Sequence, residues 1–146
     1  MTRSARSKIL VALQWIAMLG LAGTGAVVPT NLPLATLQLA AFALMFWTFA
    51  LLGIGRFNVS PEVNARARLV VRGPYRVVRH PMYVSVFALM LAWLLGRFTW
   101  TGLACGITLV VIALQKMTLE EEALAVRFPE YEGYLRHTAR LIPGIW

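Results

Sequence analysis

The sequence predicts an all-α integral membrane protein with about four transmembrane helices, arranged as two hairpins, and a cytoplasmic C-terminal amphipathic helix. Two observations support this prediction. Hydrophobic residues make up 59% of the 146 residues, against about 45–50% in a typical soluble domain. The charged residues are confined to segments that separate four apolar runs. We expect residues 1–146 to form one domain.

The four apolar runs are expected to pair in chain order. The first two runs, residues 9–28 and 32–54, each have about the 20 residues that cross a hydrocarbon core. The junction "VPTN" leaves room only for a tight turn between them. The runs at 82–95 and 98–114 are shorter and predict a tightly paired second hairpin. The run at 82–95 is short enough to be either a full span or a re-entrant helix.

The basic residues predict the orientation of these helices. Of the 14 lysines and arginines, 13 precede the first run, separate the second from the third, or follow the fourth, and only Arg97 lies on the other side. The positive-inside rule makes the crowded side cytoplasmic, with both termini inside, as in a multi-pass protein of the cell membrane. A signal peptide is the weaker reading of the N-terminus, because its apolar run exceeds the usual 7–15 or so residues and no clean cleavage site follows.

Composition also narrows the functional classes. The net charge of +8 is explained by basic residues at membrane edges, so we expect no nucleic-acid partner. No charged residue lies inside an apolar run, whereas a proton-coupled transporter needs an ionisable group at membrane depth. The single cysteine, Cys105, excludes an internal disulfide, and we expect no metal site. We therefore expect any polar chemistry to take place in residues 56–81 and 115–146.

The first polar segment ends in "RGPYRVVRHPMYVS", residues 72–85. Its Gly-Pro pair at 73–74 marks a turn. His80 precedes a proline and is expected at a helix boundary, with Pro81 as the first helical residue. A helix N-terminus attracts anions, and Arg79 and Arg76 reinforce that charge. The alternative is that these residues only anchor the helix at the headgroup level.

The second polar segment is "KMTLEEEALAVRFPEYEGYLRHTARLIPGIW", residues 116–146. Helical neighbours are about 100° apart, so at least one carboxylate of Glu120–Glu122 is expected to face the arginine-rich first segment. His137 is predicted to be an exposed surface residue. An apolar stripe with spacings of 4, 3 and 4 predicts an amphipathic helix against the bundle: Leu124, Phe128, Tyr131 and Leu135.

Together, "GPYRVVRHPMY" and "EEEALAVRFPEYEGYLRHTARLIP" resemble motifs of the isoprenylcysteine carboxyl methyltransferase and phospholipid methyltransferase superfamily. The resemblance covers residues 72–143, about half of the chain. Either motif alone is weak, and the pair around a helical hairpin is specific. The resemblance implies a small integral-membrane enzyme that uses S-adenosylmethionine to methylate a lipid or another hydrophobic small molecule.

The resemblance also implies roles for individual residues. Lys116 departs from the family's arginine at that position, which puts a bidentate role there in doubt. Catalytic roles are implied for Tyr83, Glu121 and Arg79, and acceptor contacts are assigned to Arg140 and Tyr131. Cofactor contacts are implied for Val78, Arg79, His80, Pro81, Tyr83, Glu120 and Glu121.

The chemistry of the cofactor fits these assignments. The helix start at Pro81, with Arg79, suits the cofactor's carboxylate, and Glu120 or Glu121 suits its ammonium group. The ring of Tyr83 or Tyr131 can stabilise the sulfonium by a cation–π interaction of about 0.5–2 kcal/mol.

The sequence leaves the acceptor and the oligomeric state open. A prenylcysteine-type carboxylate needs no base, whereas a phospholipid amine must lose a proton, with Tyr83, His80 or a glutamate as the base. The main alternative function is an NADPH-dependent membrane reductase of the sterol or steroid reductase type. Such reductases end in a sequence similar to "RLIPGIW", and the arginines would bind the phosphates of NADPH. A non-catalytic membrane scaffold is a third reading.

Overall fold

A computed structural model of the chain describes residues 3–53 and 69–144. The described residues form five α-helices and one short 3-10 helix, and their only β-type pairing is one isolated bridge. The first polar segment, residues 56–81, is described only from residue 69 onward, so Arg56, Arg66 and Arg68 lie outside the described residues. The elements are α1 (Arg3–Thr24), α2 (Leu32–Leu52), η1 (Gly73–Arg76), α3 (Pro81–Gly96), α4 (Trp100–Arg127) and α5 (Tyr131–His137).

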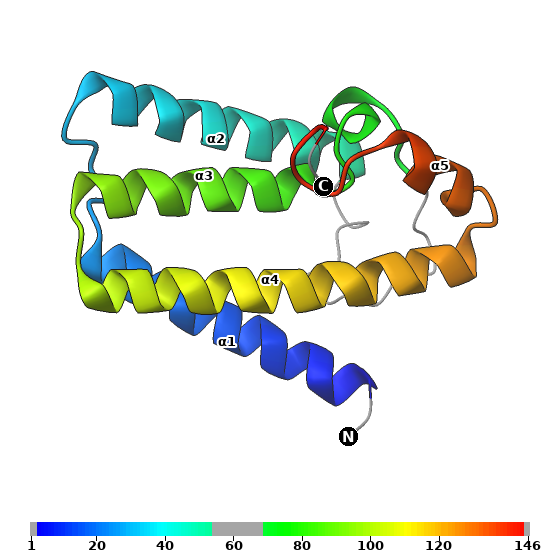
Figure 1. Cartoon of the computed structure of the whole chain (residues 1–146), viewed down its shortest axis with the longest axis horizontal. Coiled ribbons are helices and arrows are strands. Elements are labelled where there is room, and N and C mark those ends of the chain that lie inside the picture. The colour runs from blue at the N-terminus through cyan, green and yellow to red at the C-terminus, as the bar shows by residue number, and fades with distance from the viewer. Residues whose placement is uncertain (1–2, 54–68, 145–146) are drawn as a thin grey trace.

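The four long helices form a bundle with the polar segments at one end. The turns that join α1 to α2 and α3 to α4 lie together at the opposite end of the bundle (Figure 1). The start of α3, the end of α4, η1 and α5 gather at the polar end. The two polar segments therefore share one end of the apolar bundle, as the sequence predicted.

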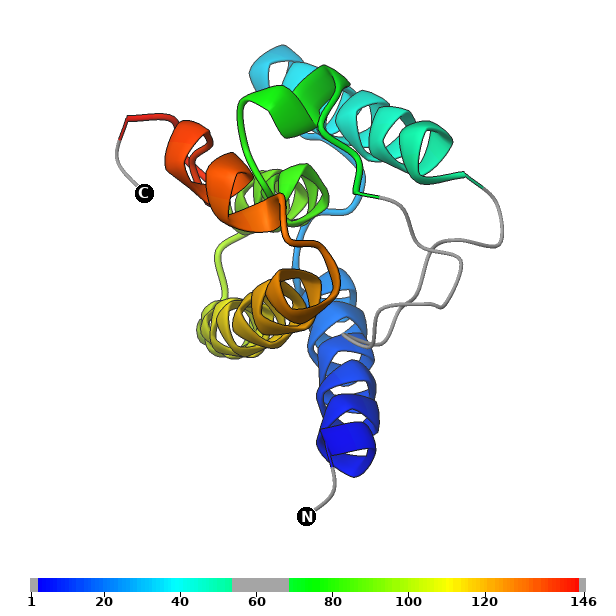
Figure 2. The same ribbon diagram turned by 90° about the vertical axis from the view of Figure 1, so that its right-hand side faces the viewer.

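The prediction that helices pair in chain order is wrong in detail. The main helix contacts are α1 with α4 and α2 with α3, while the contact between α3 and α4 is slight; Figure 2 shows this arrangement end on. Small residues explain the pairing of α1 with α4. A Cβ added at Gly20 would lie 2.8 Å from the Cys105 Sγ, so glycine at this position allows α1 to approach α4 without displacing that side chain.

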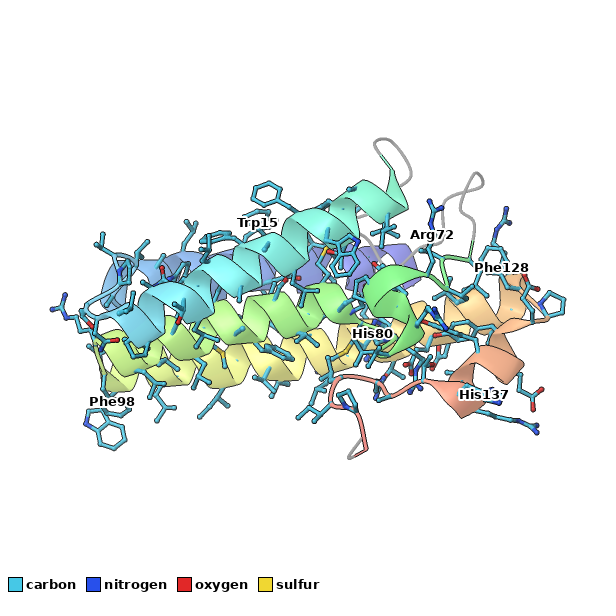
Figure 3. The ribbon with its side chains drawn as sticks, turned by 90° about the horizontal axis from the view of Figure 1, so that it is seen from above. Trp15, Arg72, His80, Phe98, Phe128 and His137 are labelled. Carbon is cyan, nitrogen blue, oxygen red and sulfur yellow. The ribbon has the colours of Figure 1, made fainter. Side chains whose placement is uncertain are left out.

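Two helices, α2 and α4, are long and apolar enough to cross a membrane by length and composition. The apolar parts of the other two, Lys8–Thr24 and Pro81–Gly96, are shorter than a typical span. The first helix ends at Thr24, four residues before the predicted end of its run. Large apolar side chains such as Trp15 and Phe46 are exposed on the bundle surface (Figure 3), which suits a hydrocarbon environment.

The fourth helix extends well beyond its predicted end at residue 114. It begins after Thr99, whose side chain accepts a hydrogen bond from the Gly102 N–H at 3.0 Å, and it continues for 28 residues to Arg127. The three consecutive glutamates therefore lie on a continuous helix whose other end is apolar. This rigid connection fixes the carboxylates relative to the bundle.

The predicted amphipathic stripe is divided between two helices. Leu124 lies on α4 and Phe128 caps its C-terminus, whereas Tyr131 begins the seven-residue α5. Pro129 explains the break, because the residue before a proline avoids the helical region and Phe128 has φ −121° and ψ 105°. The chain turns here, so α5 folds back over the end of the bundle (Figure 1).

Replacing Gly73 with alanine is expected to destabilise the protein by about 1–3 kcal/mol, the cost of a non-glycine residue in the left-handed region. Gly73 has φ +61°, and an added Cβ would lie 2.7 Å from the Leu51 Cδ1 on α2. Thermal unfolding in detergent measures the effect. Gly133→Ala is the control, because its added Cβ meets nothing within 4 Å. Equal midpoints for the two variants would contradict this role of Gly73.

Candidate active site

The candidate site lies where the start of α3 meets the end of α4. Figure 3 places His80 at this junction, beside the C-terminal segment, with Phe98 at the far end of the bundle. His80 is the N-cap of α3 and Pro81 is its first residue, as the sequence predicted. The His80 side chain makes no capping hydrogen bond to the helix. Its ring is therefore available to the carboxylates of α4.

The start of α3 and the end of α4 form two walls of the site, and residues 138–140 form the third. A parallel bridge joins Val78 to Ala139. The Arg79 N–H donates to the Ala139 carbonyl at 2.8 Å, the Ala139 N–H donates to the Val77 carbonyl at 3.1 Å, and the His80 N–H donates to the Arg140 carbonyl at 3.2 Å. These hydrogen bonds tie the stretch that precedes α3 to a segment about sixty residues further along the chain.

Glu121 binds three basic side chains at once. Its Oε1 lies 3.0 Å from the Arg79 Nε and 3.1 Å from the His80 Nε2, and its Oε2 lies 3.2 Å from the Arg140 Nη2. Both carboxylate oxygens are therefore engaged. The Glu121 and Arg79 side chains are 19% and 14% exposed, so water screens their attraction only in part.

Arg79 connects this carboxylate to α5. Its Nη1 donates to the backbone carbonyl of Leu135 at 3.3 Å and to that of Thr138. These carbonyls lie near the C-terminal end of α5 and just beyond it, where backbone acceptors lack helical partners. One guanidinium therefore positions α5 relative to α4.

Glu120 has a different environment. Its Oε1 accepts a hydrogen bond from the Tyr83 hydroxyl at 2.8 Å, and its Oε2 lies 3.6 Å from the His80 Nδ1. No arginine or lysine among the described residues forms an ion pair with Glu120. Glu120 therefore keeps acceptor capacity that Glu121 has already used.

Two tyrosines of α5 lie beside this network. The Tyr134 hydroxyl donates to the Tyr75 carbonyl at 2.7 Å, and burial raises the pKa of Tyr134 to about 12. Tyr131 is 1% exposed, and its hydroxyl has no hydrogen-bond partner within residues 3–53 and 69–144. Burial, followed by the charge of Glu121, raises the pKa of the Tyr131 hydroxyl, so the hydroxyl keeps its proton at neutral pH.

Lys116 lies outside the network. It is 3% exposed, and its Nζ donates to the Gln14 Oε1 on α1 at 2.7 Å. The basic residue one turn before the glutamates therefore joins α4 to α1. Gln14 was missed by the sequence analysis, although a lone glutamine within an apolar run is itself a signal of a polar partner.

Most of the predicted site residues meet in one cluster. Of the remainder, Val78 contributes its backbone to the bridge and is buried, and Tyr131 lies beside the cluster. Arg76 is exposed and lies outside it, and His137 is exposed as predicted. The sequence analysis missed Thr118, whose hydroxyl accepts from the Arg140 Nη2 at 2.8 Å. The residues brought together by side-chain contacts are Arg79, His80, Tyr83, Glu120, Glu121 and Arg140.

Comparison with known proteins finds one similar protein and one matching family model. The nickel-cobalt-cadmium resistance protein NccN of Alcaligenes xylosoxydans xylosoxydans is 30% identical over 97 residues, which cover 63% of this chain and 45% of that protein. The chain thus matches less than half the length of this relative. The family model for phospholipid methyltransferases matches residues 30–130, which include α2, α3 and nearly all of the site except its C-terminal wall. The chain therefore belongs to the phospholipid methyltransferase family, whose members are membrane methyltransferases.

Proposed function

We propose that this protein transfers a methyl group from S-adenosylmethionine to a lipid-like or hydrophobic acceptor at the cytoplasmic face of the membrane. The observation that carries the proposal is the convergence of the 79–83 stretch and the Glu120–Glu121 pair at the polar end of an apolar bundle. A water-soluble methyl donor and a lipid-dissolved acceptor can meet only at such a boundary.

The groups in the cluster fit the cofactor's ionic groups. Glu120 is the carboxylate with unused acceptor positions, so it is the group that would hold the cofactor's ammonium. The uncapped N-terminus of α3 suits the carboxylate, and the Tyr83 ring suits the sulfonium. When bound, the cofactor supplies an electrophilic methyl group.

Glu121 has a positioning role in this proposal. Three basic side chains already satisfy its two oxygens, so it holds Arg79, His80 and Arg140 in fixed positions. Fixed positions matter because correct orientation of reactants can lower a barrier by about 7–11 kcal/mol. The sequence could not show which of the two glutamates binds the cofactor. We assign cofactor binding to Glu120, and we assign to Glu121 the role of holding the three basic side chains in place.

The acceptor is either a carboxylate of the prenylcysteine type or an amine of the phospholipid type. Methylation of a carboxylate needs no base. Methylation of an ammonium headgroup requires that a proton leave first, and Glu120 and His80 are the site groups that can accept it. The basic residues at the polar end support its assignment to the cytoplasmic side, by the positive-inside rule.

Incubation of the protein in lipid nanodiscs with a radiolabelled methyl donor tests the proposal. One arm supplies a total lipid extract and the other supplies a farnesylated N-acetylcysteine. We expect label in the product of one arm and, at a donor concentration below saturation, much less label with Glu120→Gln. Absence of label in both arms, together with binding of NADPH and not of S-adenosylhomocysteine, would overturn the proposal in favour of the reductase.

A further inference from the structure

The hydroxyl of Tyr131 is a buried polar group that has no hydrogen-bond partner among residues 3–53 and 69–144. Of Tyr83, Tyr131 and Tyr134, two have acceptors: Tyr83 donates to Glu120, and Tyr134 donates to the Tyr75 carbonyl. Tyr131 is the most buried of the three, at 1% exposure, yet its hydroxyl makes no hydrogen bond to any described residue. Leaving such a group unsatisfied is costly, so its presence needs an explanation.

The surroundings of Tyr131 link it to the site. Its hydroxyl lies within electrostatic reach of Glu121, Arg79 and Glu120, and its ring centroid is 5.7 Å from that of Tyr134. Two carboxylates are therefore close by, and neither accepts the hydroxyl proton. The hydroxyl therefore remains an unused donor among the described residues.

The charges on the two sides of the site differ. Glu121 is surrounded by Arg79, His80 and Arg140, so basic side chains balance its negative charge. Glu120 forms no ion pair with an arginine among the described residues, and its basic neighbours are His80 at 3.6 Å and, at longer range, Lys116. Tyr131 begins α5, the helix whose C-terminal end accepts hydrogen bonds from Arg79. A protonated hydroxyl beside arginines is a donor suited to an oxyanion.

We propose that the Tyr131 hydroxyl donates a hydrogen bond to an anionic oxygen of a ligand bound in this site. The inference rests on the proposed methyltransferase function and assigns one further binding group within it. A carboxylate or phosphate oxygen has the required chemistry, and it can come from the methionyl carboxylate of the cofactor or from the headgroup of the acceptor.

Tyr131→Phe tests this inference, because it removes only the hydroxyl oxygen. In the ligand-free protein its thermal midpoint is expected to equal or exceed that of the wild type, since no hydrogen bond of the fold is lost. Ligand affinity is expected to fall about tenfold or more, as for loss of a hydrogen bond to a charged group. Tyr134→Phe is the matched control, and its midpoint should fall because the Tyr75 carbonyl loses its donor.

The measurements are thermal unfolding, titration with S-adenosylhomocysteine, and the KM of the labelled acceptor, all in nanodiscs. Weaker S-adenosylhomocysteine binding by Tyr131→Phe assigns the hydroxyl to the cofactor carboxylate, and a raised acceptor KM alone assigns it to the acceptor. A Tyr131→Phe midpoint that falls as far as that of Tyr134→Phe overturns the inference, as does an unchanged affinity for both ligands. A wild-type protein that binds no S-adenosylhomocysteine overturns the proposed function itself.

Discussion

Replacing Glu121 with alanine is expected to lower the free energy of unfolding by about 3 kcal/mol and to abolish methyl transfer. The substitution removes the shared anionic partner of Arg79, His80 and Arg140. Breaking a buried ion pair by removing one partner costs roughly 3–5 kcal/mol, and the residual exposure of these side chains places the effect at the lower end. The loss of activity follows because Arg79 would no longer be fixed between α4 and α5.

Thermal and denaturant unfolding of the variant in nanodiscs, followed by the labelled-methyl assay, measures both effects. Glu132→Ala is the matched control, because that glutamate forms an ion pair with Arg136 one helical turn away while remaining 77% exposed. An exposed pair of this kind contributes at most about 0.5 kcal/mol. A Glu121→Ala variant as stable as Glu132→Ala would show that the three ion pairs do not support the fold.

Replacing Glu120 with glutamine is expected to weaken binding of S-adenosylhomocysteine by about 10- to 150-fold. A hydrogen bond to a charged group is worth about 1.5–3 kcal/mol, and the substitution removes the charge that the cofactor's ammonium would meet. The fold should be retained, because the amide oxygen of glutamine can still accept the Tyr83 hydroxyl. Isothermal titration gives the affinity, and thermal unfolding checks the fold.

Glu121→Gln separates the two roles. It keeps the size of the side chain but weakens three ion pairs, so its thermal midpoint should fall further than that of Glu120→Gln. If the two variants instead lose stability equally while Glu120→Gln binds S-adenosylhomocysteine as tightly as the wild type, the assignment of the ammonium to Glu120 is wrong.

Local features of the fold were predictable because they are encoded in adjacent residues. The Gly-Pro turn at 73–74 and the His80–Pro81 boundary depend on backbone restrictions that act within two or three residues. The break after Phe128 has the same origin, and the proline at 129 could have revealed it. The pairing of α1 with α4 was not predictable, because it depends on the fit of Gly20 against Cys105 across the bundle.

The site was predictable in its ionisable residues and not in their partners. The clustering of carboxylates opposite arginines indicated that Glu120 or Glu121 would face the first polar segment, and both do. Which groups each glutamate contacts depends on the directions of the side chains, and the spacing of residues along the sequence does not determine those directions. The contact of Arg79 with the Thr138 carbonyl has no sequence signature at all, because every residue carries a backbone acceptor.

The bridge between Val78 and Ala139 also bears on biosynthesis. These residues are 61 positions apart. Closing a loop of this length has an entropic cost, which the folding of the intervening helices α3 and α4 must offset. The third wall of the site cannot form until residue 140 has left the ribosome, when the helices before it have already been made. A nascent chain thus lacks a complete candidate site until residue 140 has been made.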